Sequence, residues 1–149
     1  MNTFQLEQLC TSHPKLKRHF KGVFASNELP KFVSSYPAAF ILNTQPRSKS
    51  GEHWVAIFLN AKYNGEYFDS YGFPPMNQNV IRFLKRNTAK WTYSKKVLQN
   101  PISLMCGGFC IYFLVKKSQG QSLRYILSTF KNNAVENDNK VNRFLKRVF

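Results

Sequence analysis

Three short apolar runs, each bounded by turn residues, predict strands in the first half of the chain. They are PAAFILNT (residues 37–44), HWVAIFL (53–59) and GEYFDSYGF (65–73). Each run is rich in β-branched and aromatic residues, which is typical of strands. A fourth strand is expected over KWTYSKKVLQ, residues 90–99.

Helical spacing of apolar residues predicts an amphipathic helix over NQNVIRFLKRNT, residues 77–88. A first helix is expected to begin near Thr3, with the basic stretch TSHPKLKRHFKG (11–22) at the surface around it. Residues 122–133 and 141–149 are expected to form two more helices. This order of helices and strands predicts the α+β fold class.

The segment from Phe109 to Lys117 is apolar until it ends in two lysines. Lysines are favourable at a helix C-terminus, so we interpret the segment as a buried central helix. Periodicity alone leaves a buried strand open. The apolar stretch is too short to span a bilayer, so no membrane association is expected.

Composition indicates one folded domain over residues 1–149. Hydrophobic residues make up 43% of the chain and aromatic residues 15%, as in a globular protein with a core. The first residues lack the pattern of a secretory signal, so we expect a protein that is not secreted. Cys10, Cys106 and Cys110 do not have zinc-ligand spacing, which predicts a reducing compartment and no structural metal.

The charge is strongly positive: 22 Lys and Arg residues against 7 Asp and Glu give +15. Such a field attracts polyanions, which predicts contact with nucleic acid without sequence readout. The sequence contains no zinc-finger spacing, no RNP motif and no heptads after a basic region. Charge therefore indicates a partner and leaves the chemistry open.

The segment LQNPISLMCGGFC (98–110) places Cys106 directly before two glycines, at the start of the apolar segment. If a helix begins at Cys106, its dipole favours the thiolate form of that cysteine. Gly107 and Gly108 leave room for a substrate backbone, and the Gly107 amide could support an oxyanion. A packed core thiol is the alternative for Cys106, and it suits Cys110.

A nucleophilic cysteine needs a histidine to take its proton and a third group to orient that histidine. His53 opens a predicted strand, where its side chain can face a cleft. His13 and His19 lie in the basic N-terminal region and are expected to be solvated. Asp69 is the best-placed acid in the strand region, and the side-chain amide of Gln99 could donate to the developing oxyanion.

In the order His, acid, Gln, Cys, the segments GEHW, YFDSYGF and LQNPISLMCGGFC resemble the adenovirus protease (adenain) family of cysteine proteases. The similarity runs from about Phe20 to the C-terminus and includes FKGVFASNELPKFVSSYPAAFILNT and VNRFLKRVF. The resemblance implies Cys106 as nucleophile with His53 as general base. Asp69 would orient His53, and Gln99 would donate to the oxyanion. Aspartate followed by serine is more similar to the SUMO-specific proteases, because the adenovirus family usually has glutamate there.

The implied fold is papain-like and adenain-type: a central mixed β-sheet packed by helices, with the nucleophile at the N-terminus of a buried central helix. The implied function is cleavage of viral capsid and core precursor polypeptides at glycine-containing sites, in the virion and the host nucleus. The protein is expected to be a monomer without a metal or small-molecule cofactor. A divergent adenovirus-like virus, or a virus-like DNA transposon, is the expected source.

The family also implies two activators. DNA is one of them, in agreement with the charge. The other is a short peptide that a disulfide links to a cysteine between the middle helix and the glutamine. The corresponding segment here, NTAKWTYSKKVLQ (87–99), has no cysteine, so a peptide activator would bind without a disulfide.

Two other kinds of function stay open. A deubiquitinase or SUMO-specific protease of the same clan, or an acetyltransferase, would use the same order of catalytic residues. A non-catalytic basic DNA-binding core protein would carry the charge without depending on Cys106.

The proposed triad places a condition on one hairpin. The Asn-Gly dipeptide at 64–65 favours a tight two-residue hairpin, which would pair Asp69 with Asn60. Asp69 would then lie about 23 Å along the strand from His53. A His53–Asp69 pair therefore requires a turn centred nearer residues 60–62, with the glycine acting as a bulge or bend.

Overall fold

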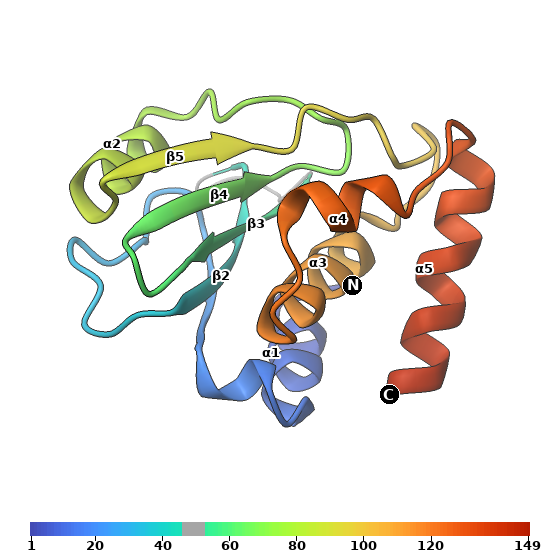
Figure 1. Cartoon of the computed structure of the whole chain (residues 1–149), viewed down its shortest axis with the longest axis horizontal. Helices are drawn as coiled ribbons and strands as arrows, with labels where there is room; N and C mark the ends of the chain where they lie inside the picture. The colour runs from blue at the N-terminus through green and yellow to red at the C-terminus, as the bar shows by residue number, and fades with distance from the viewer. Residues whose placement is uncertain (46–52) are drawn as a thin grey trace.

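The backbone forms a five-stranded sheet with helices on both of its faces (Figure 1). The structure is a computed structural model and describes residues 1–45 and 53–149. Its elements are, in order, α1 (Thr3–Ser12), η1 (Leu16–Arg18), β1 (Phe20–Phe24), β2 (Ala38–Asn43), β3 (Trp54–Leu59), β4 (Asn64–Phe68), α2 (Gln78–Asn87), β5 (Lys90–Tyr93), α3 (Cys106–Ser118), α4 (Leu123–Ser128) and α5 (Ala134–Val148). The expected α+β class is confirmed.

The five strands lie in the order β1-β2-β3-β4-β5, so β3 is the central strand. β2, β3 and β4 form an antiparallel meander. β1 pairs with β2 in parallel, and β5 pairs with β4 in parallel. The sheet is therefore mixed, as the family resemblance implied.

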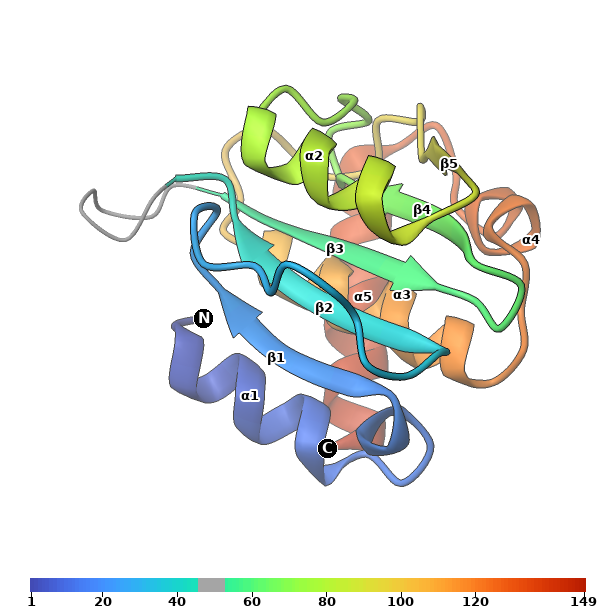
Figure 2. The same ribbon diagram turned by 90° about the vertical axis from the view of Figure 1, so that its left-hand side faces the viewer.

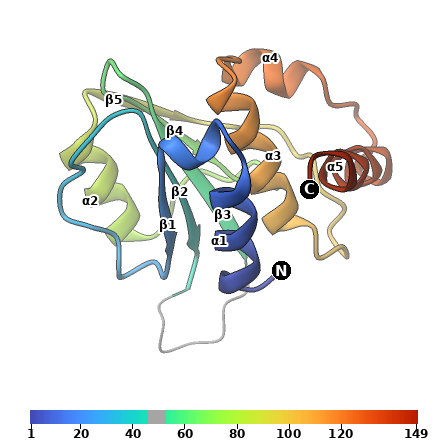
Figure 3. The same cartoon turned by 90° about the horizontal axis from the view of Figure 1, so that it is seen from below.

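Both faces of the sheet are covered, which explains why its central strand β3 is apolar at every position. Along β2, Ala39 and Ile41 belong to the core that contains α3, and Phe40 and Leu42 belong to the core beneath α2. The ring of Phe40 meets that of Phe83 on α2 edge to face, with centroids 5.2 Å apart. Figure 3 shows α2 on one side of the strands and α1, α3 and α5 on the other.

The helix α3 is the centre of the larger core. Every residue from Gly107 to Val115 is buried, and the Phe113 ring stacks on that of Phe68 in β4, with centroids 4.6 Å apart. At the other end of the helix, Lys117 Nζ lies 2.6 Å from a carboxylate oxygen of Glu66 in β4. Figure 2 shows α3 and α5 together behind the strands. The expected central helix is confirmed, and the alternative of a buried strand is excluded.

The hairpin between β3 and β4 turns earlier than its Asn-Gly dipeptide suggests. The backbone N–H of Tyr63 donates to the carbonyl of Asn60, and the N–H of Asn60 donates to the carbonyl of Asn64. Tyr63 has a positive φ of 62°, the left-handed residue that a three-residue hairpin loop requires. The turn is thus centred near Lys62, which confirms the condition that a His53–Asp69 pair demanded.

The expected bulge at Gly65 is wrong. Gly65 pairs with Leu59 in regular register. A glycine is needed there for a different reason, because a Cβ would lie 2.8 Å from Cγ2 of Thr88 and 3.3 Å from Cβ of Trp91. The residue gives the chain that leads from α2 into β5 room to pass close to β4.

Two predicted strands are shorter than expected. β4 ends at Phe68, because the next residues form a turn in which the N–H of Gly72 donates to the carbonyl of Asp69. β5 ends at Tyr93, and Lys95 has a positive φ of 56°, which is incompatible with an extended strand. Asp69 directly follows the first of these strands, and Ser94 directly follows the second.

The N-terminal prediction missed β1. Residues 16–24, expected in part as a basic surface stretch, form η1 and then this edge strand. Only Val23 of β1 is buried, and the pairing with β2 is irregular between Phe20 and Gly22. An edge strand with one buried side chain has no apolar alternation for a sequence pattern to detect.

The last two helices have different limits from those expected. The helix predicted over residues 122–133 ends at Ser128. The helix predicted from Val141 begins at Ala134, where the side chain of Asn133 accepts from the N–H of Glu136. Its polar first half buries Asn137, whose amide donates to the carbonyls of Leu98 and Lys131. Among the described residues, no helix is both long and apolar enough to cross a bilayer.

Candidate active site

Cys106 is the first residue of α3, so its thiol lies at the positive end of a helix of 13 residues. The side chain is half-buried, whereas the next two residues are buried. A Cβ at Gly107 would lie 3.0 Å from Cδ2 of Leu6 and 3.5 Å from Cδ1 of Trp54. The small residue after Cys106 therefore lets α1 and the start of β3 pack against the N-terminus of α3.

His53 lies immediately before β3 and joins Cys106 to Asp69. Its Nε2 atom is 2.8 Å from Oδ1 of Asp69. Cys106 lies close enough to the imidazole to raise its pKa, and Nδ1 is the ring nitrogen left for the thiol because Nε2 contacts Asp69. His53 therefore lies between Asp69 and Cys106.

Asp69 is held rigidly at the end of β4. It is 4% exposed, and its Oδ1 also accepts from the backbone N–H of Tyr71 at 2.8 Å. The hydroxyl of Ser94 accepts from the N–H of Asp69 and donates to its carbonyl. Ser94 lies 25 residues away, so no local pattern in the sequence pointed to it.

Hydrogen bonding and charge override burial in the Cys106–His53 pair. Burial alone would lower the pKa of His53, but hydrogen bonds to Asp69 and Cys106, and their negative charges, raise that pKa to about 9. Burial would raise the pKa of Cys106, but the hydrogen bond and charge of His53 and the backbone N–H groups of Trp54 and Gly107 lower it. A thiolate–imidazolium pair is therefore favoured at neutral pH.

Gln99 is fully buried and contacts Ser70, the residue that follows Asp69. Its Oε1 accepts from the hydroxyl of Ser70 at 2.6 Å. Its Nε2 donates to the carbonyl of Ser103 at 2.9 Å and to the hydroxyl of Ser103 at 3.1 Å. The amide donors of Gln99 are thus both directed at Ser103, a partner that the sequence did not suggest.

A cavity of about 480 Å³ opens next to the histidine and the aspartate. It lies between the ends of the central strands and the start of α2, and its wall is largely apolar. His53, Asp69 and Tyr71 line one part of it, and Phe73 and Met76 line another. Phe73 and Met76 are 55% and 73% exposed, so an extended ligand could contact both.

The remaining histidines and cysteines do not extend the site. His13 is buried and accepts from the N–H of Leu16, so the expectation that it is solvated is wrong. Cys10 and Cys110 are fully buried, and burial raises the pKa of the Cys10 thiol to about 12 and that of Cys110 as well. In the part of the chain that the structure describes, no three His, Cys, Asp or Glu side chains converge as metal ligands would.

Comparison with known proteins shows the family of the chain. Residues 20–140 match the family model of the adenovirus endoprotease. The chain belongs to the adenovirus endoprotease family. The expected resemblance is thereby confirmed, and the family is one of viral cysteine proteases.

Members of this family that resemble the chain include the protease of human adenovirus B serotype 3. It is 33% identical over 111 residues, which cover 64% of this chain and 53% of the relative. The protein named SUMO-1 cysteine protease S273R of African swine fever virus is 27% identical over 101 residues, covering 60% of this chain and 37% of the relative. The chain spans about half the length of the curated adenovirus relatives it matches.

Solved structures support the adenovirus endoprotease fold. A crystal structure of the African swine fever virus pS273R protease covers 96% of this chain and 66% of its own, with a TM-score of 0.66 and 19% identity. ChlaDub1 of Chlamydia trachomatis covers 74% of this chain and 58% of its own, with a TM-score of 0.53 and 16% identity. At these identities the likeness concerns the fold alone.

The lowered pKa of Cys106 predicts selective alkylation. As the pH falls, the thiolate of Cys106 should persist below the ordinary thiol pKa of 9.0, because His53 stabilises it. Iodoacetamide should therefore modify Cys106 between about pH 6 and 9 while Cys10 and Cys110 stay unmodified. Peptide mass mapping of the folded protein over this pH range measures all three rates.

The control is His53→Gln, which should move the midpoint of the Cys106 alkylation profile up toward the ordinary thiol value. Equal profiles for His53→Gln and the wild type would contradict the thiolate–imidazolium pair.

Proposed function

We propose that this protein is a cysteine endopeptidase in which Cys106 is the nucleophile, His53 the general base and acid, and Asp69 the group that orients His53. The observation that carries the proposal is the His53 ring, with Nε2 on Asp69 and its other nitrogen facing the thiol at the start of α3. This order of base, orienting acid and nucleophile is that of a triad. The structural alternative, a packed core thiol, fits Cys10 and Cys110, which are fully buried.

The chemistry follows from the two perturbed pKa values. The Cys106 thiolate attacks the scissile carbonyl carbon, and the His53 imidazolium gives its proton to the leaving amine. The resulting thioester is then hydrolysed by a water molecule that His53 deprotonates. The negative charge of Asp69, at 2.8 Å, stabilises the imidazolium throughout.

Gln99 and the Gly107 backbone amide are the proposed oxyanion donors. The Gly107 N–H helps to lower the pKa of the Cys106 thiol, which supports its assignment as a donor near the reacting centre. Gln99 needs to turn one N–H from Ser103 toward the oxyanion. The hydroxyl of Ser103 is the weaker of its two acceptors at 3.1 Å, so we assign the transferable donor to that contact.

Removing the Gln99 donor should slow peptide cleavage without slowing alkylation. Gln99→Met keeps the length of the side chain but has no N–H, and kcat should fall about 100-fold or more. Iodoacetamide forms no oxyanion, so the Cys106 alkylation rate should stay within about twofold of the wild-type rate. Ser103→Ala, which keeps the Ser103 carbonyl acceptor, is the matched control and should retain kcat. Equal losses of both rates in Gln99→Met would contradict the oxyanion role.

The proposed substrates are viral precursor polypeptides cleaved at glycine-containing sites. Glycine-containing sites are the substrates that membership of the adenovirus endoprotease family suggests. The cavity beside His53 suits an apolar side chain a few residues upstream, because Phe73 and Met76 line it. Such substrates would place the protein in the virion and the host nucleus.

A protease for ubiquitin-like proteins is the second candidate. It is favoured by the relative named SUMO-1 cysteine protease, and by Asp69, which is followed by Ser70 as in SUMO-specific proteases. The same triad would serve both substrates, so only the substrate separates the two functions.

Substrate cleavage tests the proposal directly. Fluorogenic peptides with a Gly-containing site and an upstream Leu or Met should be cleaved, and Cys106→Ala should abolish the cleavage. A ubiquitin-like fusion serves as the competing substrate. Preferential cleavage of the fusion would favour the second candidate, and no cleavage of either substrate, with unchanged DNA binding in Cys106→Ala, would favour a non-catalytic DNA-binding protein.

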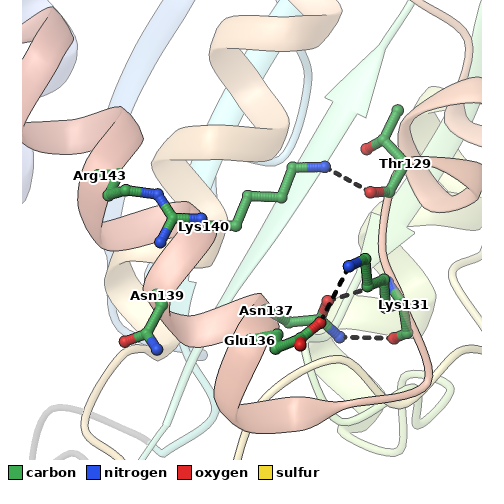
Figure 4. A pocket seen from close by; sticks show the side chains of 7 residues that line it. All are labelled: Thr129, Lys131, Glu136, Asn137, Asn139, Lys140 and Arg143. Atoms are coloured by element: carbon green, nitrogen blue, oxygen red, sulfur yellow. Dashed lines mark hydrogen bonds and ion pairs between the residues drawn. The ribbon is translucent and has the colours of Figure 1, made fainter.

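We also propose that double-stranded DNA assists the enzyme without sequence readout, drawn by the +15 charge. One basic cluster lies where α3, α4 and α5 meet. Lys140 is close enough to Lys116 and Lys96 that their charges, together with burial, lower its pKa. An adjoining pocket of about 300 Å³ is lined by Lys140 and Arg143, and by Lys131, which pairs with Glu136 at 3.2 Å (Figure 4).

A peptide activator, if the enzyme uses one, would bind without a disulfide. Cys10 and Cys110 are fully buried and their pKa values are raised, so neither presents a thiolate to a partner. We propose that the protein acts as a monomer, without a metal or small-molecule cofactor.

A salt series tests the placement of DNA. Arg143 is exposed on α5, and Arg143→Ala should weaken DNA binding and reduce the slope of log K against log salt by about one. Arg82→Ala is the matched control, because Arg82 is exposed on α2, across the sheet, and the change in net charge is the same. Fluorescence anisotropy with a short duplex measures both. Equal losses for the two variants would indicate a diffuse electrostatic attraction and contradict the cluster.

A further inference from the structure

Tyr71 contacts more of the site than its place in a surface turn suggests. The turn is tight: the N–H of Gly72 donates to the carbonyl of Asp69 at 2.8 Å, and Gly72 has a φ of +77°. A Cβ at Gly72 would lie 2.9 Å from the backbone carbonyl of Lys96. The segment after β5 thus restricts the path of the turn that carries Tyr71.

The Tyr71 ring lies against the face of the His53 ring. The two centroids are 4.9 Å apart and the planes are inclined by 25°, which is a stacked arrangement. The backbone N–H of the same residue donates to Oδ1 of Asp69, the oxygen that Nε2 of His53 also contacts. Tyr71 therefore contacts two members of the proposed triad through different groups.

The hydroxyl of Tyr71 extends toward the segment that leads from Gln99 to Cys106. It lies 3.5 Å from the carbonyl of Pro101, a distance at which a hydrogen bond contributes little. Burial, followed by the charges of Cys106 and Asp69 and then that of Asp138, raises the pKa of Tyr71, so its ring is uncharged at neutral pH. The face of the ring, rather than the hydroxyl, is the principal contact with the site.

A stacking partner restrains the rotation of the His53 ring, which the His53–Asp69 hydrogen bond alone does not prevent. That bond restrains one end of the imidazole, but the ring can still rotate about the bond to its Cβ, and rotation would move the second nitrogen away from Cys106. A flat side chain on one face resists this rotation. The π-electrons of the tyrosine also favour the charged form of the imidazole over the neutral form.

We propose that Tyr71 is a positioning residue that holds the His53 ring in the plane in which one nitrogen meets Asp69 and the other meets Cys106. The inference rests on the proposed function, since it assigns His53 as the base. The competing explanation is that Tyr71 only forms a wall of the adjacent cavity and contacts the substrate. The two explanations differ in whether the free enzyme's thiol changes when Tyr71 is replaced.

The test compares Tyr71→Leu and Tyr71→Phe in the full chain. Tyr71→Leu removes the stacked ring, and kcat should fall about tenfold with KM within about threefold of the wild-type value. The midpoint of the Cys106 alkylation profile should move up by about half a unit to one unit, because the imidazolium is held less well. Tyr71→Phe keeps the ring and should restore both quantities. Tyr125→Leu, which removes a tyrosine that is 55% exposed on α4, controls for a general effect on the fold.

Two outcomes would overturn the proposal. One is an unchanged alkylation profile in Tyr71→Leu together with a raised KM, which would make the residue a cavity wall. The other is an equal loss in Tyr71→Phe, which would assign the effect to the hydroxyl. If no peptide is cleaved by the wild type, the proposed endopeptidase activity fails, and the alkylation profiles still test the role of Tyr71 in orienting His53.

Discussion

The register of the β3–β4 hairpin is the constraint on which the site depends. Leu59 pairs with Gly65 and Ala56 with Phe68, so the strand ends that carry His53 and Asp69 emerge at the same edge of the sheet. A slip of one residue would turn every side chain of β4 to the opposite face, which would remove Phe68 from the core around α3 and Glu66 from its contact with Lys117. Burial of both faces of the sheet therefore selects the register, and the 2.8 Å contact between the histidine and the aspartate is a consequence of it.

The second requirement is that α3 be fixed relative to that hairpin, since Cys106 belongs to the helix and its partners belong to the sheet. The helix is held along its length by burial and at its far end by the contact between Lys117 and Glu66. The stacked rings of Phe113 and Phe68 lie between these contacts. Core packing thus sets the distance across which the thiol meets the imidazole, and no flexible loop has to supply it. A site of this kind is pre-organised by the elements that make the protein fold.

The parts of this arrangement that sequence analysis could predict are those with a local signal. The apolar segment after Cys106 predicted α3, and the chemistry of a cysteine nucleophile directed attention to His53 and Asp69. The Asn-Gly dipeptide favoured a different hairpin, and only the need to bring these two residues together pointed to the observed turn. Tertiary packing decided the conflict, because the glycine makes room for Thr88 rather than forming the turn.

The contacts that the sequence could not reveal are those between distant polar side chains. Ser94 forms hydrogen bonds with Asp69, and Ser103 and Ser70 form hydrogen bonds with Gln99. Serine is common in loops, so these residues gave no signal in the sequence. The edge strand β1 was missed for a related reason, since a single buried side chain gives no periodicity. A buried amide or carboxyl group needs hydrogen-bond partners. Gln99 is fully buried, so it requires such partners, but its burial does not tell which residues they are. The positions of both kinds of contact follow from the assembled fold.

The helix α3 also separates the proposed catalytic site from the proposed DNA-binding cluster. Cys106 and Lys116 lie ten residues apart on α3, which corresponds to about 15 Å along its axis. At physiological ionic strength, charges in solvent are screened over about 8 Å. A phosphate bound at the basic cluster would therefore change the pKa of the Cys106 thiol little. The proposed DNA would then act by concentrating the enzyme near its substrates, which would change the rate of encounter rather than the chemical step.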